Sequence, residues 1–237
     1  MFREMKKMRY QTVVPGIFCS RPNRFIALVE TDGRVEPCHV KITGRCRELL
    51  LPGGKVYLAL ADNPKRKTRY DLIAVQKGDL LINMDSQSPN AAVAEALQRY
   101  FPHARCIRPE YTLGCSRFDF YVETAEKRYL IEVKGVTLEQ DGKTFFPDAP
   151  TLRGRKHLHE LTQLTRQGYT ACIVFVIQME KVCSFSPNGV TDPAFANALK
   201  MAADSGVHIA CVSCRVTPNS MTLDHPVPLD WTAVYTS

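Results

Sequence analysis

Long apolar segments are missing from this chain of 237 residues. Its longest uninterrupted apolar stretch, residues 171–177, has the length of a core strand. A membrane-spanning helix needs roughly 20 such residues. The basic N-terminus leads into polar residues and Pro15 instead of the apolar core of a signal peptide. We therefore expect a cytoplasmic protein with no membrane partner.

Paired cysteines and several common catalytic patterns are also missing. The nine cysteines are odd in number and scattered, which argues against the disulfide framework of a secreted protein. Cys211 and Cys214 have zinc-like spacing, but no second close Cys/His pair accompanies them, so we interpret them as small buried residues. No internal repeat, Ser-His-Asp arrangement, phosphate-binding glycine loop or dinucleotide fingerprint is found.

Positive charge is present and unevenly distributed. Residues 1–85 carry the whole formal net charge of +7, because they contain 16 Lys/Arg and 9 Asp/Glu. Residues 86–237 contain 15 Lys/Arg and 15 Asp/Glu and are neutral. An excess confined to the first third indicates a contact surface for a polyanion, and nucleic acid is the leading candidate.

Two short segments concentrate these cations. A loop contains Lys65, Arg66, Lys67 and Arg69 next to Tyr70. We expect the cations to contact phosphates and Tyr70 to stack on a base, the alternative being a solvated turn. A second cluster at the start of an expected helix consists of Arg153, Arg155, Lys156 and His157, for which anion binding and a solvated helix start remain open alternatives.

The first 85 residues read as consecutive short strands without a strong helix pattern. The expected strands are residues 24–30, 35–42, 55–61, 70–76 and 79–84. This arrangement favours a small β-barrel such as an OB-fold, whose strand face commonly binds single-stranded nucleic acid. The polar stretch 85–90 marks a boundary, so we expect one domain at residues 1–85 and another at 86–237.

The second part alternates helices and strands, which predicts an α/β domain with a mixed sheet. Asn90 is expected to cap its first helix, and residues 138–150 are expected to form a loop because they contain Gly142, Pro147 and Pro150. The expected helices are 91–100, 152–167 and 193–205, and the expected strands are 117–122, 129–135, 169–179 and 207–216.

A candidate site lies on the two strands of the first expected hairpin. The period of two in a strand points Glu132 and Lys134 to the same face, and a suitable register brings Asp119 beside them. Hard carboxylate oxygens suit Mg²⁺ or Mn²⁺, and Lys134 would then either hold the attacking water or stabilise charge on the phosphoryl oxygens. Glu95, on the preceding helix, is a further candidate carboxylate. The alternative is that Glu132 and Lys134 pair on a solvated edge.

Several segments together resemble the SfsA family, the sugar fermentation stimulation proteins. They cover nearly the whole chain and are RPNRF (21–25), DNPKRK (62–67), RFDF (117–120), IEVKGVTL (131–138) and FPDAPTLRGRKHL (146–158). Where the family usually has Asn-Thr-Gly, this chain has Ile42-Thr43-Gly44, so an amide is replaced by an apolar group.

This resemblance implies an N-terminal OB-fold and a C-terminal domain similar to PD-(D/E)XK nucleases. It also implies non-specific DNA binding, to which Arg24 would contribute, and a regulatory role in sugar metabolism. The implied catalytic set is Asp119, Glu132 and Lys134 with Glu95, and Asp119 and Glu132 would hold the Mg²⁺ or Mn²⁺. A DNA-binding regulator and an active nuclease for DNA or RNA remain alternatives, because a nuclease-like fold also serves as a binding platform. The oligomeric state stays open, a dimer included.

Overall fold

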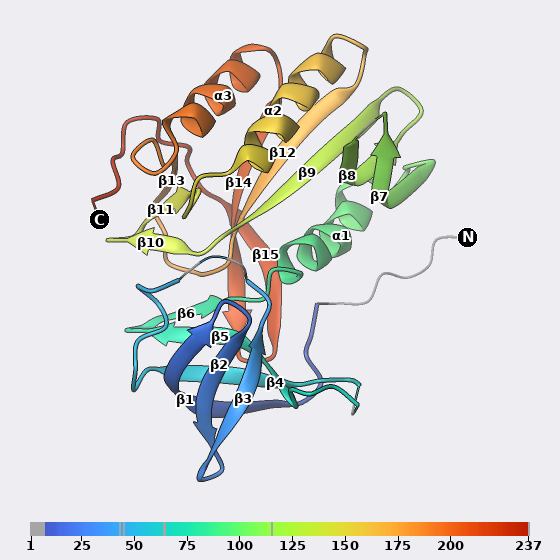
Figure 1. Ribbon diagram of the computed structural model, residues 1–237. Helices are drawn as coiled ribbons and strands as arrows, with labels where there is room; N and C mark the ends of the chain where they lie inside the picture. Colours follow the sequence, from blue (N-terminus) through green and yellow to red (C-terminus); the bar gives the residue numbers. More distant parts are fainter. Residues whose placement is uncertain (1–7, 43, 45, 64, 115, 237) are drawn as a thin grey trace.

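The N-terminal third of the chain forms a closed barrel, the barrel half of the fold (Figure 1). The computed structural model describes residues 8–236 except 43, 45, 64 and 115. Strands β1 to β5 pair in a ring that closes through a parallel contact between β3 and β5, and β6 extends the sheet beyond β5. The strands are β1 (Val13–Asn23), β2 (Ile26–Thr31), β3 (Arg34–Val40), β4 (Lys55–Leu60), β5 (Tyr70–Lys77) and β6 (Leu80–Asn83).

The C-terminal half is a mixed six-stranded sheet with helices on both faces. Its strand order is β15-β14-β12-β9-β8-β7, and β12 runs parallel to both β9 and β14. The strands are β7 (Cys106–Leu113), β8 (Ser116–Glu123), β9 (Arg128–Val136), β12 (Thr170–Ile177), β14 (His208–Thr217) and β15 (Ser220–Pro226). Helix α1 (Ser88–Tyr100) packs on one face, and α2 (Leu152–Thr165) and α3 (Pro193–Asp204) pack on the other.

This architecture confirms the predicted fold class, a β-barrel followed by an α/β domain with a mixed sheet. The prediction of a loop at 138–150 is partly wrong. Strands β10 (Leu138–Gln140) and β11 (Lys143–Phe146) form a hairpin there, and β11 also pairs in parallel with β13 (Ser184–Pro187). Gly142 adopts φ of +77° at its turn, so the glycine that suggested a loop is a hairpin residue.

Helix α1 begins earlier than predicted. Gln87 occupies the cap position without a side-chain hydrogen bond, Pro89 lies in the first turn, and Asn90 is inside the helix. The strands β1, β7, β13 and β15 were not predicted. Polar and proline residues interrupt the apolar pattern of β7, because this strand lies at an edge of the sheet.

The barrel and the α/β sheet share one hydrophobic core. Leu72 and Met84 of the barrel half and Val136 and Phe185 of the other half belong to a single buried cluster. Next to it, the buried amide of Gln178 donates to the backbone oxygen of Asn83 at 2.9 Å. Across the described part of the chain, no helix is long and apolar enough to span a bilayer.

Candidate functional site

The site begins where strands β8 and β9 stop pairing. Regular pairing of the two strands ends at Phe120 and Ile131. Beyond that point the Asp119 Oδ2 accepts a hydrogen bond from the backbone N–H of Val133 at 2.7 Å. The carboxylate therefore takes the place of a backbone carbonyl of the neighbouring strand. Its Oδ1 accepts a hydrogen bond from Asn90 of α1, also at 2.7 Å. Asp119 is therefore held from two sides at the opening between the strands.

Glu132 carries the second carboxylate of the site, and it is buried, with 2% of its surface exposed. Its Oε1 accepts from Lys134 Nζ at 2.5 Å and bonds to the ring Nδ1 of His157 on α2. Its Oε2 has no hydrogen-bond partner in the described part of the chain, although it is inaccessible to solvent. A buried carboxylate oxygen without a partner is costly, so Glu132 Oε2 is an acceptor with capacity for a ligand.

The two carboxylates respond differently to their surroundings. Burial raises the pKa of Asp119, and the nearby charge of Glu132 raises it further. Burial also acts to raise the pKa of Glu132, but the His157 hydrogen bond and the charge of Lys134 outweigh it and lower the pKa of that carboxyl. A repelling carboxylate pair is what a bound cation would stabilise.

The donor set fits a hard divalent cation with several waters. Asp119 and Glu132 would supply the oxygen ligands, and Glu132 Oε2 is the oxygen that accepts no hydrogen bond from the described residues. Among residues 8–236, apart from those not described, no group of three or more His, Cys, Asp or Glu side chains is arranged to hold a metal. Mg²⁺ and Mn²⁺ retain several water ligands when bound to a protein. A site with two carboxylates therefore suits them better than a site in which every ligand is a protein group.

Comparisons with known proteins agree with this architecture. The family model "SfsA N-terminal OB domain" matches residues 19–84, and "Sugar fermentation stimulation protein RE domain" matches residues 87–220. The chain belongs to the SfsA family. A "Sugar fermentation stimulation protein homolog" of Desulfitobacterium hafniense (strain Y51) is 54% identical over 215 residues, which cover 90% of this chain and 94% of the relative.

Other SfsA-family proteins match over the same length. A homolog of Clostridium beijerinckii (strain ATCC 51743 / NCIMB 8052) is 51% identical over 218 residues, covering 91% of this chain and 96% of that protein. The solved structure described as "The structure of Pyrococcus Furiosus SfsA in complex with Ca²⁺" matches with a TM-score of 0.84 and 28% identity, covering 95% of this chain and 99% of that one.

The structure brings Asp119, Glu132 and Lys134 together and adds two residues that were not predicted for the site. His157 lies inside the SfsA segment 146–158, and its apolar neighbours Leu158 and Leu161 mark the buried face of α2. That periodicity is the signal by which His157 could have been placed near the sheet. Asn90 was misread as a helix cap, because a polar residue before an alanine-rich helix usually has that role.

Glu95 lies in a different setting. Its carboxylate accepts the backbone N–H of Met8 at 3.4 Å, and the α1 side chain that reaches Asp119 is Asn90. Asn90 and Glu95 are five positions apart, which places them on different sides of the helix. The catalytic role expected for Glu95 therefore receives no support from its contacts.

The cationic loop of the barrel differs from its prediction at two positions. Lys65, Lys67 and Arg69 are exposed, as phosphate contacts require. Arg66 instead donates to Asp71, with the shorter bond at 2.7 Å. Tyr70 is only 4% exposed, because the first residue of β5 points into the barrel, so the expected stacking of Tyr70 on a base is corrected. Pro64 lies outside the described residues.

The remaining predicted cations are divided between solvent and internal pairs. Arg24 is exposed and lies over the ring of Phe25 at 5.7 Å. Of the three on α2, Arg153 is exposed and Lys156 is exposed beside Glu160. Arg155 pairs with Asp192 at the start of α3, at 3.8 Å. Of the segment Ile42-Thr43-Gly44, Thr43 lies outside the described residues.

We expect Asp71→Asn to lower the free energy of unfolding by about 2 kcal/mol at pH 7, since it weakens hydrogen bonds to charged donors. Burial acts to raise the pKa of Asp71, but the Arg66 hydrogen bond and the charge of Lys41 lower it below its ordinary value of 3.8. The ionised carboxylate therefore stabilises the fold above that pH, and this contribution is lost as the pH falls through the lowered pKa.

Denaturant titrations between pH 3 and 7 would measure this contribution. The wild-type chain should lose stability on acidification more steeply than Asp71→Asn. The exposed carboxylate Asp79, in the β5–β6 turn, provides a matched control, and Asp79→Asn should follow the wild-type curve. Parallel curves for wild type and Asp71→Asn would contradict the pKa shift.

Proposed function

We propose that this chain binds nucleic acid, principally DNA. We also propose that its second domain contains a phosphodiesterase centre that depends on a divalent cation. The observation that carries the proposal is the buried, unpartnered Glu132 Oε2, held next to Asp119 and Lys134. The SfsA relative from Pyrococcus furiosus is described in complex with Ca²⁺, which supports divalent-cation binding in the family.

Asp119 and Glu132 would hold Mg²⁺ or Mn²⁺, which when bound polarises a phosphodiester and lowers the pKa of a coordinated water. The surrounding residues position these ligands. Lys134 and His157 both bond to Glu132 Oε1, which leaves Oε2 as the oxygen that would take the cation. Lys134 is also placed to stabilise negative charge on a phosphoryl oxygen, since its side chain is 15% exposed.

Substrate capture would fall to exposed cations in both halves of the chain. Lys65, Lys67 and Arg69 extend from the barrel loop. Arg153 and Lys156 lie on the first turns of α2, the helix that also carries His157 to the site. These exposed cations would hold the phosphate backbone by charge alone, which suits binding without sequence preference.

A second candidate is a DNA-binding regulator in which the cation centre is structural. The charge asymmetry favours it, because the whole excess of positive charge lies in the barrel half, away from the carboxylates. The relatives' name, sugar fermentation stimulation protein, is consistent with a regulatory role in sugar metabolism. A cytoplasmic location agrees with the eight free cysteines of the described residues.

The deciding experiment incubates the wild-type chain with linear, nicked and single-stranded DNA and with RNA. We expect cleavage with Mn²⁺ or Mg²⁺, loss of cleavage in EDTA, and recovery when Mn²⁺ is restored. Calorimetric titration with Mn²⁺ alone separates metal binding from turnover. Binding of Mn²⁺ and DNA without cleavage of any substrate would favour the regulator, and cleavage that persists in EDTA would overturn the metal centre.

Neutralising the barrel loop should weaken DNA binding in a salt-dependent way. For the triple variant Lys65→Gln, Lys67→Gln and Arg69→Gln, we expect the slope of log K against log salt to fall by about 2 to 3, because each lost phosphate contact removes roughly 0.9. Fluorescence anisotropy between 50 and 200 mM salt, roughly the range in which such contacts dominate, measures the slope. A triple variant of exposed second-domain lysines, at Lys127, Lys181 and Lys200, serves as the control and should retain it.

A further inference from the structure

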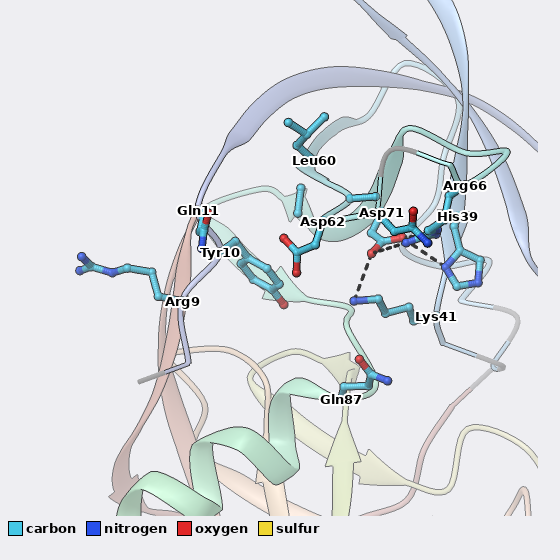
Figure 2. A pocket seen from close by; sticks show the side chains of 13 residues that line it. Arg9, Tyr10, Gln11, His39, Lys41, Leu60, Asp62, Arg66, Asp71 and Gln87 are labelled. Carbon is cyan, nitrogen blue, oxygen red and sulfur yellow. Dashed lines mark hydrogen bonds and ion pairs between the residues drawn. The ribbon is translucent and has the colours of Figure 1, made fainter. Parts of the chain in front are cut away.

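A cavity of about 480 Å³ lies between the barrel, the N-terminal segment and the start of α1. Side chains from β3, the end of β4, the loop after β4 and the residue before α1 surround it (Figure 2). Neither Asp119 nor Glu132 lines it, so it is separate from the carboxylate site. Its volume is within the range of pockets that enclose one small ligand, roughly 300–1,000 Å³.

The charged side chains on the floor of this cavity neutralise one another. Arg66 and Lys41 both pair with Asp71, at 2.7 and 3.2 Å. Lys41 also donates to Asp85 at 2.8 Å, so its single charge faces two carboxylates. The third Arg or Lys of the lining, Arg9, points away from this floor (Figure 2). The floor therefore offers no unpaired cation to an anionic ligand.

Two polar side chains of the lining have no partner in the part of the chain that the structure describes. The Asp62 carboxylate points into the cavity, and the amide of Gln87 lies at the same space (Figure 2). An ammonium group has three N–H bonds, so two carboxylates leave one N–H of Lys41 for a ligand. The open groups are therefore a mixture of hydrogen-bond donors and acceptors around one space.

The wall of the cavity adds apolar surface. The Tyr10 hydroxyl donates to Asp85 at 3.1 Å and accepts from Asn83 at 3.2 Å, which fixes the aromatic ring in place. Leu60 is 41% exposed and lines the same cavity. A fixed aromatic ring beside hydrogen-bonding groups suits a ligand that has an apolar face and a polar edge.

This lining disfavours ligands of either charge. An anion would be repelled by the unpaired carboxylate of Asp62. A cation attracted to Asp62 would lose hydration for a single carboxylate and would meet the ammonium of Lys41 at the same space. A neutral ligand with several hydroxyl groups avoids both costs. Each hydroxyl can donate to a carboxylate and accept from an ammonium or an amide.

We propose that this cavity binds a neutral sugar unit. Its hydroxyls would bond to Asp62, Lys41 and Gln87, and its apolar C–H face would pack on Tyr10. The unit is either a free monosaccharide or the ribose of an uncharged nucleoside, since both present the same hydroxyl chemistry. The proposal depends neither on nucleic-acid binding by this chain nor on a metal at Asp119.

The test is a ligand-observed NMR titration of the full chain in EDTA, which keeps the metal centre silent. The probes are a panel of pentoses and hexoses that includes ribose and glucose, together with adenosine, inorganic phosphate and putrescine. We expect saturable binding of at least one neutral probe and weaker binding of phosphate and putrescine. Asp62→Ala should weaken the neutral probe about tenfold, the effect of one hydrogen bond to a charged group. Gln87→Ala removes a neutral partner and should weaken it about threefold.

The control is Asp79→Ala, which removes an exposed barrel carboxylate outside the cavity and should change nothing. Asp62 and Gln87 are both exposed, so their variants should fold, which a melting curve checks. Adenosine binding more tightly than every free sugar would identify a nucleoside as the source, and the reverse order would identify a monosaccharide. Three results would overturn the proposal: no binding of any neutral probe, tighter binding of phosphate or putrescine, or binding that neither Asp62→Ala nor Gln87→Ala changes.

Discussion

Replacing Glu132 with alanine is expected to abolish Mn²⁺ binding and to reduce metal-dependent cleavage at least about 100-fold. The substitution removes the oxygen that has no protein partner, Oε2, and also the acceptor shared by Lys134 and His157. Loss of residues that merely orient a metal ligand already costs roughly 10- to 100-fold, so loss of a ligand should cost more.

Two further variants make this result interpretable. Glu132→Gln keeps the shape of the side chain but lacks its charge, so it should lose Mn²⁺ binding while the chain remains folded. Glu126→Ala removes an exposed carboxylate from the turn of the same β8–β9 hairpin and should behave as the wild type. Equal cleavage rates for wild type and Glu132→Ala would place the chemistry elsewhere and reject the centre.

The second large effect is expected from Gly135→Ala, next to Lys134 on β9. A Cβ at this position would lie 2.3 Å from Gln178 Oε1 and 2.9 Å from Pro89 Cγ. Gln178 cannot yield freely, because its amide donates to Asn83 of the barrel half. We expect a loss of about 3 kcal/mol, the upper range for overpacking, and a fall in Tm of roughly 5–10 °C.

Thermal unfolding followed by circular dichroism measures this effect, with Gly189→Ala as the matched control. A Cβ on Gly189 would meet only Ala196 Cβ, at an ordinary 3.8 Å, so its Tm should barely change. If Gly135→Ala melted at the wild-type temperature, the packing of β9 against Gln178 would be looser than described.

The parts of the fold with strong local patterns could be predicted from the sequence. Short apolar runs bounded by glycine gave the barrel strands, and the Leu158, Leu161 and Leu164 periodicity gave α2. Edge strands such as β7 carry mixed residues because one side of the pairing faces solvent, so no local pattern marks them.

The candidate site was predictable to the extent that one hairpin determines it. Glu132 and Lys134 share a face through the strand period alone, and the Asp119 partner follows from the register. The contributions of Asn90 and His157 come from helices packed on opposite faces of the sheet, and those contacts depend on tertiary packing. Tertiary packing is also the reason why the burial of Tyr70 was not predicted, because that burial depends on its inward-facing position in β5 of the closed barrel.

The shared core has a consequence for how the activities of this chain can be separated. Cutting at residue 85 would divide the shared cluster, with Met84 on one fragment and Val136 on the other, both of them now within 1% of full burial. Each fragment would expose a hydrophobic patch to solvent and would tend to aggregate. Single-residue variants of the intact chain, rather than excised halves, are therefore the way to assign binding and chemistry to their separate surfaces.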